Sequence, residues 1–152
     1  MSNTEFKFDF SDFDKKFKRV VEQIIPQKAE KGMAKAGMQL LNDSIMQRPT
    51  VPIREGTLRG SGSVFVQNKL IGKTPSVKGK GNPATDDSVA IGKNEIVARV
   101  GFNTPYAARV HEVPMKFSEP SAGNKYLESK MSKNKNLYFK IVANTIKEGA
   151  KW

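Results

Sequence analysis

The residues with the most chemical potential in this chain are an adjacent histidine and glutamate, His111 and Glu112. Imidazole and carboxylate groups bind metals and transfer protons, but a metal site needs further ligands at suitable spacing. His111 is the only histidine, and no acidic residue lies one helical turn from it. We therefore predict a hydrogen-bonded structural histidine and no metal site.

Two other short patterns match a functional motif only in part. Ser61 lies in a Gly-Ser-Gly run, but a strand is expected after it, whereas a hydrolase nucleophile occupies a strand-to-helix turn. The Lys-Gly-Lys-Gly run at residues 78–81 lacks the Lys-Ser/Thr ending and the helix of a phosphate-binding loop. The sequence thus predicts no catalytic residue and no cofactor.

Length and composition limit the class of protein. A chain of 152 residues with 38% hydrophobic residues can form one core, so we expect one domain over residues 1–152. There is no apolar run of about 18 residues, which argues against a membrane protein, and the N-terminus lacks the pattern of a secretory signal. The absence of cysteine excludes disulfides, thiolate metal sites and cysteine nucleophiles, and fits a reducing cytoplasm.

The net charge of +11 comes from 26 basic and 15 acidic residues. Only six of the basic residues are arginines, the side chains best suited to bidentate base recognition, so sequence-specific DNA reading is disfavoured. A diffuse lysine field still favours contact with a phosphate polymer, without sequence preference. The simpler alternative is a soluble surface rich in lysine.

Two helices are predicted in the first third of the chain. Residues 1–25 are expected to form a helical extension, capped by Ser11 or Asp12 and ended or kinked by Pro26. A second helix follows and ends before Pro49 and Pro52. The apolar stripes of the two helices are Phe13, Phe17, Val20, Val21 and Ile24, and then Ala29, Met33, Ala36, Gly37, Leu40, Leu41 and Ile45.

The middle of the chain has the two-residue period of strands. Val64 and Val66 alternate with Ser63, Phe65 and Gln67, and residues 70–71 are expected to extend that strand. Residues 72–87 contain three glycines and two prolines and are predicted to be a long mobile loop. The loop would carry a possible DNA-facing or assembly site formed by Lys73, Lys78 and Lys80.

A hairpin and a short helix are expected next. Residues 89–91 and 96–100 would pair through a turn at residues 92–94, with Ile96, Ala98 and Val100 facing inward and Arg99 outward. Thr104 and Pro105 are expected to open a short helix, with Tyr106 and Val110 on one face, that ends by Pro114.

The C-terminal part is predicted to be a loop over residues 116–124, followed by one or two helices over residues 125–148. Asn134 or Asn136 would break them, and residues 137–142 also have strand propensity. The expected apolar positions are Leu127, Met131, Leu137, Ile141 and Thr145. The fold class is α+β: a small antiparallel sheet flanked by a long N-terminal helix and a C-terminal helix, with a long mobile loop.

Three stretches, in this order, resemble the head–tail joining proteins of long-tailed double-stranded DNA phages, also called tail-completion or minor capsid proteins. They are VPIREGTLRGSGSV at residues 51–64, TPYAARVHE at residues 104–112, and GNKYLESKM at residues 123–131. The resemblance covers most of residues 26–148, but not the segment before Pro26. The matching positions are Val51, Pro52, Gly56, Thr57, Leu58, Arg59, Pro105, Tyr106, Ala107, His111, Glu112, Lys125, Tyr126, Leu127 and Glu128.

This resemblance implies an α+β subunit that forms a ring in the virion neck, assembled in the bacterial cytoplasm, with no catalysis and no membrane. The implied partners are other copies of the chain, portal-side head-completion or adaptor proteins, tail terminator or tail tube proteins, and the double-stranded DNA passing through the ring. Lysine-rich surfaces would face DNA or acidic neighbours.

The motif residues also have physical roles of their own. Gly56 can form a turn, Leu58 can fill the core, and Arg59 can pair with a carboxylate. Tyr106 can bury its ring and leave its hydroxyl in water, while His111 and Glu112 can bind a nearby loop. We favour a role in holding the fold over direct contact with a partner.

Two alternatives to the neck protein remain open. The net charge fits a sequence-nonspecific, basic nucleic-acid-binding protein of the cell, which would show a steep dependence of DNA binding on salt. A hydrolase or metal enzyme would depend on His111, Glu112 and Ser61 alone, and is the weakest of the three hypotheses.

Overall fold

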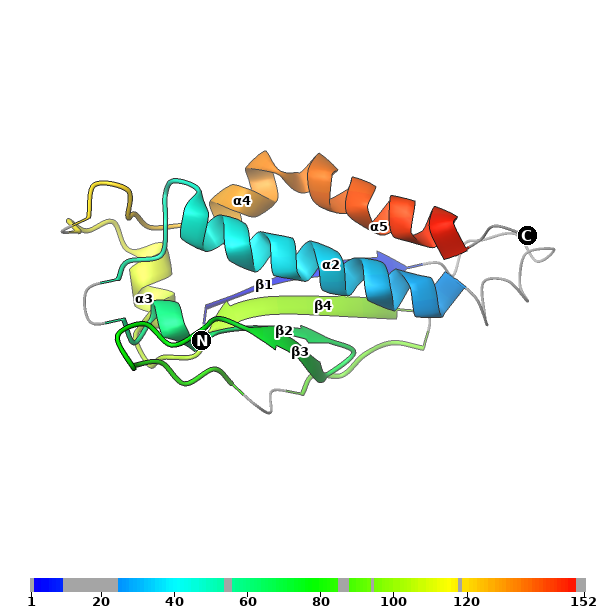
Figure 1. Ribbon diagram of the computed structural model, residues 1–152, viewed down its shortest axis with the longest axis horizontal. Helices are drawn as coiled ribbons and strands as arrows, with labels where there is room; N and C mark the ends of the chain where they lie inside the picture. Colours follow the sequence, from blue (N-terminus) through cyan, green and yellow to red (C-terminus); the bar gives the residue numbers. More distant parts are fainter. Residues whose placement is uncertain are drawn as a thin grey trace.

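An antiparallel sheet and a layer of helices on one of its faces make up the structure (Figure 1). The computed structural model describes residues 2–9, 25–53, 56–84, 88–93, 95–117 and 119–149. The core lies between the sheet and the helices, and its buried side chains come from α2, β2, β4 and α5. This arrangement confirms the predicted α+β class.

The sheet has the strand order β1-β4-β2-β3. Strand β1 spans Ser2–Asp9 and pairs with β4, Glu95–Phe102, from Ser2 opposite Phe102 to Asp9 opposite Glu95. The expected helical extension is therefore wrong for these residues, because the alternation in Glu5-Phe-Lys7-Phe has the period of a strand and β4 offers a free edge. The predicted helix over residues 13–24 and its caps lie outside the described residues.

Strands β2, Gly62–Val66, and β3, Lys69–Lys73, form a hairpin. The sequence suggested one strand extended by Leu70 and Ile71. Instead, Gln67 and Asn68 have φ values of 51° and 64°, so the chain reverses through a two-residue turn. Such turns match the twist of an antiparallel pair. As a result Leu70 and Ile71 lie on the edge strand and are partly exposed.

The predicted hairpin over residues 89–100 does not form, because both edges of β4 are occupied by β1 and β2. Val89 instead exchanges backbone hydrogen bonds with the Asn68 side chain, at 2.9 and 3.0 Å. Ile96, Ala98 and Val100 face the core as expected. Arg99 is buried rather than outward, and its guanidinium lies 5.4 Å from the centre of the Phe65 ring. A cation–π contact thus replaces solvent around this charge.

Helix α2, Ile25–Met46, packs the predicted apolar stripe against the sheet and α5. Ala29, Met33, Ala36, Leu40 and Leu41 are all buried. Pro26 occupies the first turn of α2, where its missing N–H leaves no helical hydrogen bond unmade. Among the described helices, none has the length and apolar character to cross a bilayer.

The C-terminal region forms two helices, α4, Glu128–Lys133, and α5, Lys135–Gly149, separated at Asn134. The break shifts the phase of the apolar stripe. Tyr138 and Val142 are buried against α2, whereas Leu137, expected to face inward, is exposed. The region from Leu137 to Val142 is helical, so its strand propensity is overridden by packing.

The loop expected to be mobile takes a defined path through the described residues 74–84. Thr74 exchanges backbone and side-chain hydrogen bonds with Gly62, and Val77 and Lys80 pair across a tight turn. Gly81 has a φ of +114°, and a β-carbon there would lie 2.3 Å from the carbonyl carbon of Gly60. The loop is therefore packed closely against the segment that precedes β2.

Candidate functional site

The three motif stretches meet at one end of the molecule, the end that carries α3, Ala107–Glu112 (Figure 1). The Lys125 amide donates to the His111 carbonyl at 2.7 Å, and the Tyr126 hydroxyl donates to the Ala107 carbonyl at 3.2 Å. These bonds join the second and third stretches. The first stretch meets the second at a groove described below. We call this region the motif end.

In the first stretch, Gly56 has a φ of +88°, and a β-carbon there would lie 2.4 Å from the Val77 carbonyl oxygen. Leu58 is buried in the core, as predicted. The Arg59 Nε and Nη2 atoms both donate to the Val51 carbonyl, at 3.1 and 2.5 Å. The hydrogen-bond acceptor of Arg59 is thus a backbone carbonyl, and Glu119 provides a carboxylate charge that acts on it. Burial lowers the pKa of Arg59, and the charge of Glu119 opposes that shift.

Within the first stretch, the short 3-10 helix η2, Arg59–Ser61, leads into β2. Ser61 is fully buried; its Oγ donates to the Leu58 carbonyl at 2.6 Å and accepts from the Asn103 amide at 3.0 Å. Its position excludes a nucleophilic role in this conformation. In the second stretch, Thr104 does not cap α3 with its side chain: its buried hydroxyl has no hydrogen-bond partner among the described residues.

His111 is a structural residue, as predicted. Its Nε2 accepts hydrogen bonds from the Leu127 and Glu128 amides, at 3.4 and 3.3 Å, at the start of α4. The Nδ1 atom therefore carries the proton and donates to Glu112 Oε1 at 2.8 Å. The imidazole also packs edge-on against the Tyr126 ring, with centroids 4.8 Å apart. His111 thus fastens α3 to α4.

His111, Glu112 and Glu128 place one potential metal-ligating atom each within 4.8 Å of one another. The Lys125 ammonium, however, binds both Glu112 and Glu128. A metal at Nδ1 would also require the proton to move to Nε2, which faces two N–H donors. Hydrogen bonding from Lys125 lowers the pKa of Glu112, and hydrogen bonding to Glu112 raises the pKa of Lys125. The chemistry is that of a surface ion-pair cluster.

The motif end contains a groove with a volume of about 750 Å³. One wall comes from the first stretch, the other from α3, and residues 115–119 form its margin. Tyr106 is 43% exposed and Met115 is 39% exposed, so the groove presents apolar surface to solvent. The lining residues are Pro52, Ile53, Thr57, Leu58, Tyr106, Val110, Met115, Lys116, Phe117 and Glu119.

Sequence reasoning missed the contribution of Met115, Lys116, Phe117 and Glu119 to the groove, and expected residues 116–124 to be only a loop. The signal available was the alternation of Met115 and Phe117 with charged or polar neighbours, which is unusual for a solvated loop. The margin is held in place because Glu119 Oε1 accepts a hydrogen bond from the Ile53 amide at 2.5 Å. This bond joins two segments that are far apart in the sequence.

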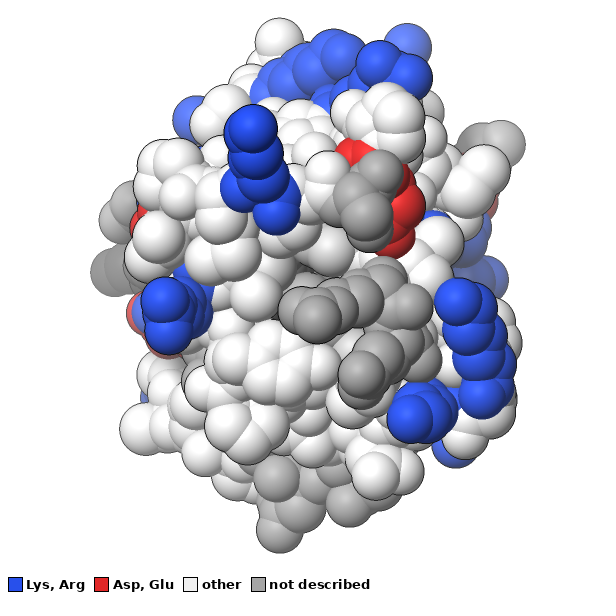
Figure 2. Space-filling view, turned by 90° about the vertical axis from the view of Figure 1, so that its left-hand side faces the viewer, with Lys and Arg blue, Asp and Glu red and all other residues white. Residues whose placement is uncertain are grey.

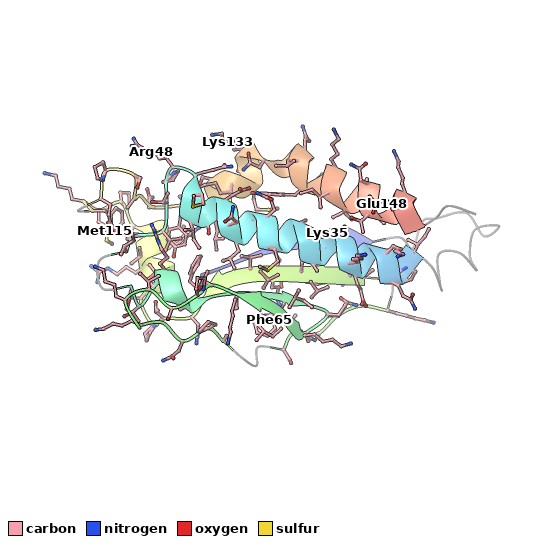
Figure 3. All side chains as sticks on the ribbon, in the orientation of Figure 1. Lys35, Arg48, Phe65, Met115, Lys133 and Glu148 are labelled. Atoms are coloured by element: carbon pink, nitrogen blue, oxygen red, sulfur yellow. The ribbon has the colours of Figure 1, made fainter. Side chains whose placement is uncertain are left out.

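Several separate basic side chains lie on the face that carries the groove. Viewed from the motif end, Lys and Arg lie toward the edges of this face and one acidic patch lies near its upper part (Figure 2), while Arg48 and Met115 lie at this end of the molecule (Figure 3). Lys116 lines the groove itself, and Arg109 is an exposed residue of α3. The predicted loop lysines also lie toward this end, because their loop packs on Gly56 and Gly60. They are exposed, as expected: Lys73, Lys78 and Lys80.

A second polar group lies away from the groove, in the layer between α2 and α4. Lys130 is fully buried, and its ammonium donates to the Pro49 carbonyl at 2.7 Å, to Tyr126 O at 3.1 Å and to Ser129 Oγ at 3.0 Å. Burial lowers the pKa of Lys130 to about 8. Because its donors are occupied and water is excluded, Lys130 holds the end of α2 to α4.

Comparisons with protein-family models, curated proteins and solved structures find no match for this chain.

Proposed function

We propose that this chain is a structural protein of the phage neck, a subunit of a ring that joins the DNA-filled head to the tail. The observation that carries the proposal is the convergence of the three motif stretches. They are far apart along the chain, yet they lie at a single end: the second and third share hydrogen bonds, and the first and second border one groove. A common location is what a shared docking role requires.

The chemistry of the motif end supports binding rather than catalysis. His111, Ser61 and Glu112 are each engaged in hydrogen bonds that hold the fold. The part of the motif end that is open to a partner is an apolar groove with exposed aromatic surface, and separate basic side chains lie on the same face. Such a combination suits contact with a protein partner, because apolar side chains provide affinity and charges provide orientation.

The partners that follow are other copies of this chain, portal-side head-completion or adaptor proteins, and tail terminator or tail tube proteins. The exposed lysines at Lys73, Lys78 and Lys80 would face DNA or acidic neighbours during assembly. The location would be the virion neck or the head-proximal end of the tail. These roles are consistent with the rigid helix and sheet layers behind the motif end.

The proposal is tested by electron microscopy of lysates from a phage in which this gene is silenced, with filled heads and free tails counted separately. Separated heads and tails are the expected result. Joined particles, or an absence of heads, would contradict the proposal. A triple replacement of Lys73, Lys78 and Lys80 by Glu should reduce assembly or DNA retention; normal infectious particles would remove the role of these lysines.

A second candidate, a sequence-nonspecific nucleic-acid-binding protein, is favoured by the basic residues seen at the motif end. It predicts that the isolated chain binds duplex DNA, with an affinity that falls steeply as salt increases. Filter binding or fluorescence anisotropy over a range of salt concentrations measures this slope. Weak binding at physiological salt would argue against it.

A further inference from the structure

The groove at the motif end combines three features that define the chemistry of a partner. Its walls are largely apolar, its lining includes Lys116, and the acidic residue among its described lining, Glu119, is already bonded to the Ile53 amide. Glu119 also acts electrostatically on Arg59. A complementary segment would therefore carry aromatic side chains that contact the walls and carboxylates that pair with Lys116 and the other basic side chains on this face.

One stretch of this chain has that composition. Residues 9–14 read Asp-Phe-Ser-Asp-Phe-Asp, with three acidic and two aromatic residues and no basic residue. From Phe10 onward this stretch lies outside the described residues. We propose that the groove of one copy binds residues 9–14 of a neighbouring copy. The inference rests on the proposed ring-forming function and identifies the contact between its subunits.

The position of β1 prevents residues 9–14 of one copy from reaching the groove of the same copy. Asp9 lies opposite Glu95, whereas the groove follows Phe102, which lies opposite Ser2 at the other end of β1. Seven residues of strand separate these ends by roughly 23 Å. Residues 10–14 extend at most about 17 Å from Asp9. The segment therefore reaches only a groove on another molecule.

The other anchor of the segment lies at the same end of the molecule. Residue 24 precedes Ile25, the first residue of α2, and the last turn of α2 leads into the motif end at Thr50 and Val51. A helix of 22 residues is about 33 Å long, so Ile25 also lies far from the groove (Figure 1).

Both anchors of the segment are thus at the end of the molecule opposite its receptor. A contact between opposite ends of successive copies is head-to-tail, the type that closes into a ring when the rotation permits. Each contact joins a short peptide to a groove, so single contacts are weak and the closed ring gains from their number.

The first test is a titration of the ¹⁵N-labelled full chain with a synthetic peptide, Phe-Asp-Phe-Ser-Asp-Phe-Asp, followed by NMR. We expect chemical-shift changes at Tyr106, Val110 and Met115. A peptide with Asn in place of each Asp should bind about fivefold more weakly. No change at the groove up to roughly 5 mM peptide, a concentration that detects millimolar affinity, would overturn the inference.

Charge reversal provides a matched pair of variants. Lys116→Glu changes an exposed residue that lines the groove, and Lys147→Glu changes an exposed lysine on α5. The first should weaken peptide binding about fivefold and the second should leave it unchanged. Equal effects would show nonspecific attraction of an acidic peptide to a basic protein, and would contradict a groove site.

Cross-linking tests the contact between whole chains, because the protein has no cysteine of its own. Chains with Met115→Cys and chains with Asp12→Cys are mixed and oxidised, and Lys147→Cys replaces Met115→Cys in the control mixture. We expect mixed dimers to form about tenfold faster in the groove pair. Equal rates would overturn the inference.

These measurements separate the two proposals. If silencing leaves heads and tails joined but the peptide binds the groove, the contact between copies stands without the neck function. If silencing separates heads and tails but neither peptide binding nor cross-linking occurs, the neck function stands and residues 9–14 are not the occupant.

Discussion

Two carboxylates in this molecule both accept several hydrogen bonds but have opposite surroundings. Asp43, on α2, is 2% exposed, and its oxygens accept hydrogen bonds from four side chains. Glu112, at the motif end, has 55% of its side chain exposed and binds His111 and Lys125. The donors of Asp43 are Gln39, Gln47, Asn134 and Tyr138.

The difference between the two carboxylates is the solvent. Around Asp43 water cannot replace a lost partner, so each missing hydrogen bond lowers the free energy of unfolding by the cost of leaving a buried polar group unpaired. Burial raises the pKa of Tyr138, the partner at 2.7 Å, and keeps its hydroxyl a donor. Around Glu112 water and salt ions replace a lost partner easily. The first cluster holds two helices together, while the second contributes little to stability and sets the charge of an exposed surface.

The largest effect should come from Asp43→Ala. The change removes the acceptor of the Tyr138 hydroxyl and one of the acceptors of the Asn134 amide between α2 and α5. We expect the free energy of unfolding to fall by about 3 kcal/mol in urea denaturation. Asn42→Ala, at the next, exposed position of α2, is the control. Equal losses for the two variants would show that the buried cluster contributes little.

His111→Ala should destabilise the fold by about 2 kcal/mol, because the Leu127 and Glu128 amides and the Tyr126 ring lose their partner. Thermal or urea unfolding measures the loss. His111→Gln retains a side-chain acceptor and should recover part of it. A stable His111→Ala protein would indicate that α3 and α4 are held mainly by apolar packing.

Lys130 should make stability depend on pH. Its pKa in the folded protein is about 8, below its ordinary value of 10.5, so the unfolded chain binds more protons between these values. The free energy of unfolding should therefore rise with pH, by about 1 kcal/mol between roughly pH 8 and pH 9. Lys130→Met should abolish the rise. An identical slope in the variant would refute a shifted pKa at Lys130.

Glu112→Gln should have the smallest effect. The pKa of Glu112 is lowered, so the ion pair contributes above the ordinary pKa of a glutamate, and its contribution is lost as pH falls through the lowered value. Because the side chain is exposed, we expect a small change in melting temperature that disappears in about 1 M salt. A loss as large as that of Asp43→Ala would contradict the contrast between the two clusters.

Much of the architecture was predictable because one face of each element is apolar. The stripe of α2 from Ala29 to Leu41 and the inward positions of β4 lie where their periodicity placed them. The predictions were wrong where one sequence pattern is compatible with two structures. The run containing Leu70 hides a two-residue turn at Gln67 and Asn68, and neither residue is the glycine that usually marks one.

At the motif end, local roles were predictable and contacts between segments were not. The turn at Gly56 and the burial of Leu58 follow from residue type. The pairing of Glu119 with the Ile53 amide depends on segments 66 residues apart, and even the bond from Arg59 to the Val51 carbonyl, eight residues away, depends on how the intervening chain folds back. Residue type and local spacing in a single sequence do not specify which distant donor and acceptor form a hydrogen bond.

The sequence by itself determined the α+β class, the helical and strand periods, the high net charge and the absence of thiol chemistry, because each follows from residue type and local spacing. Only the tertiary structure decided the order of the strands, the burial of Arg99, Asp43 and Lys130, and the groove at the motif end. These features arise where distant segments exclude water from between them, and solvent exclusion depends on the three-dimensional arrangement of the whole chain.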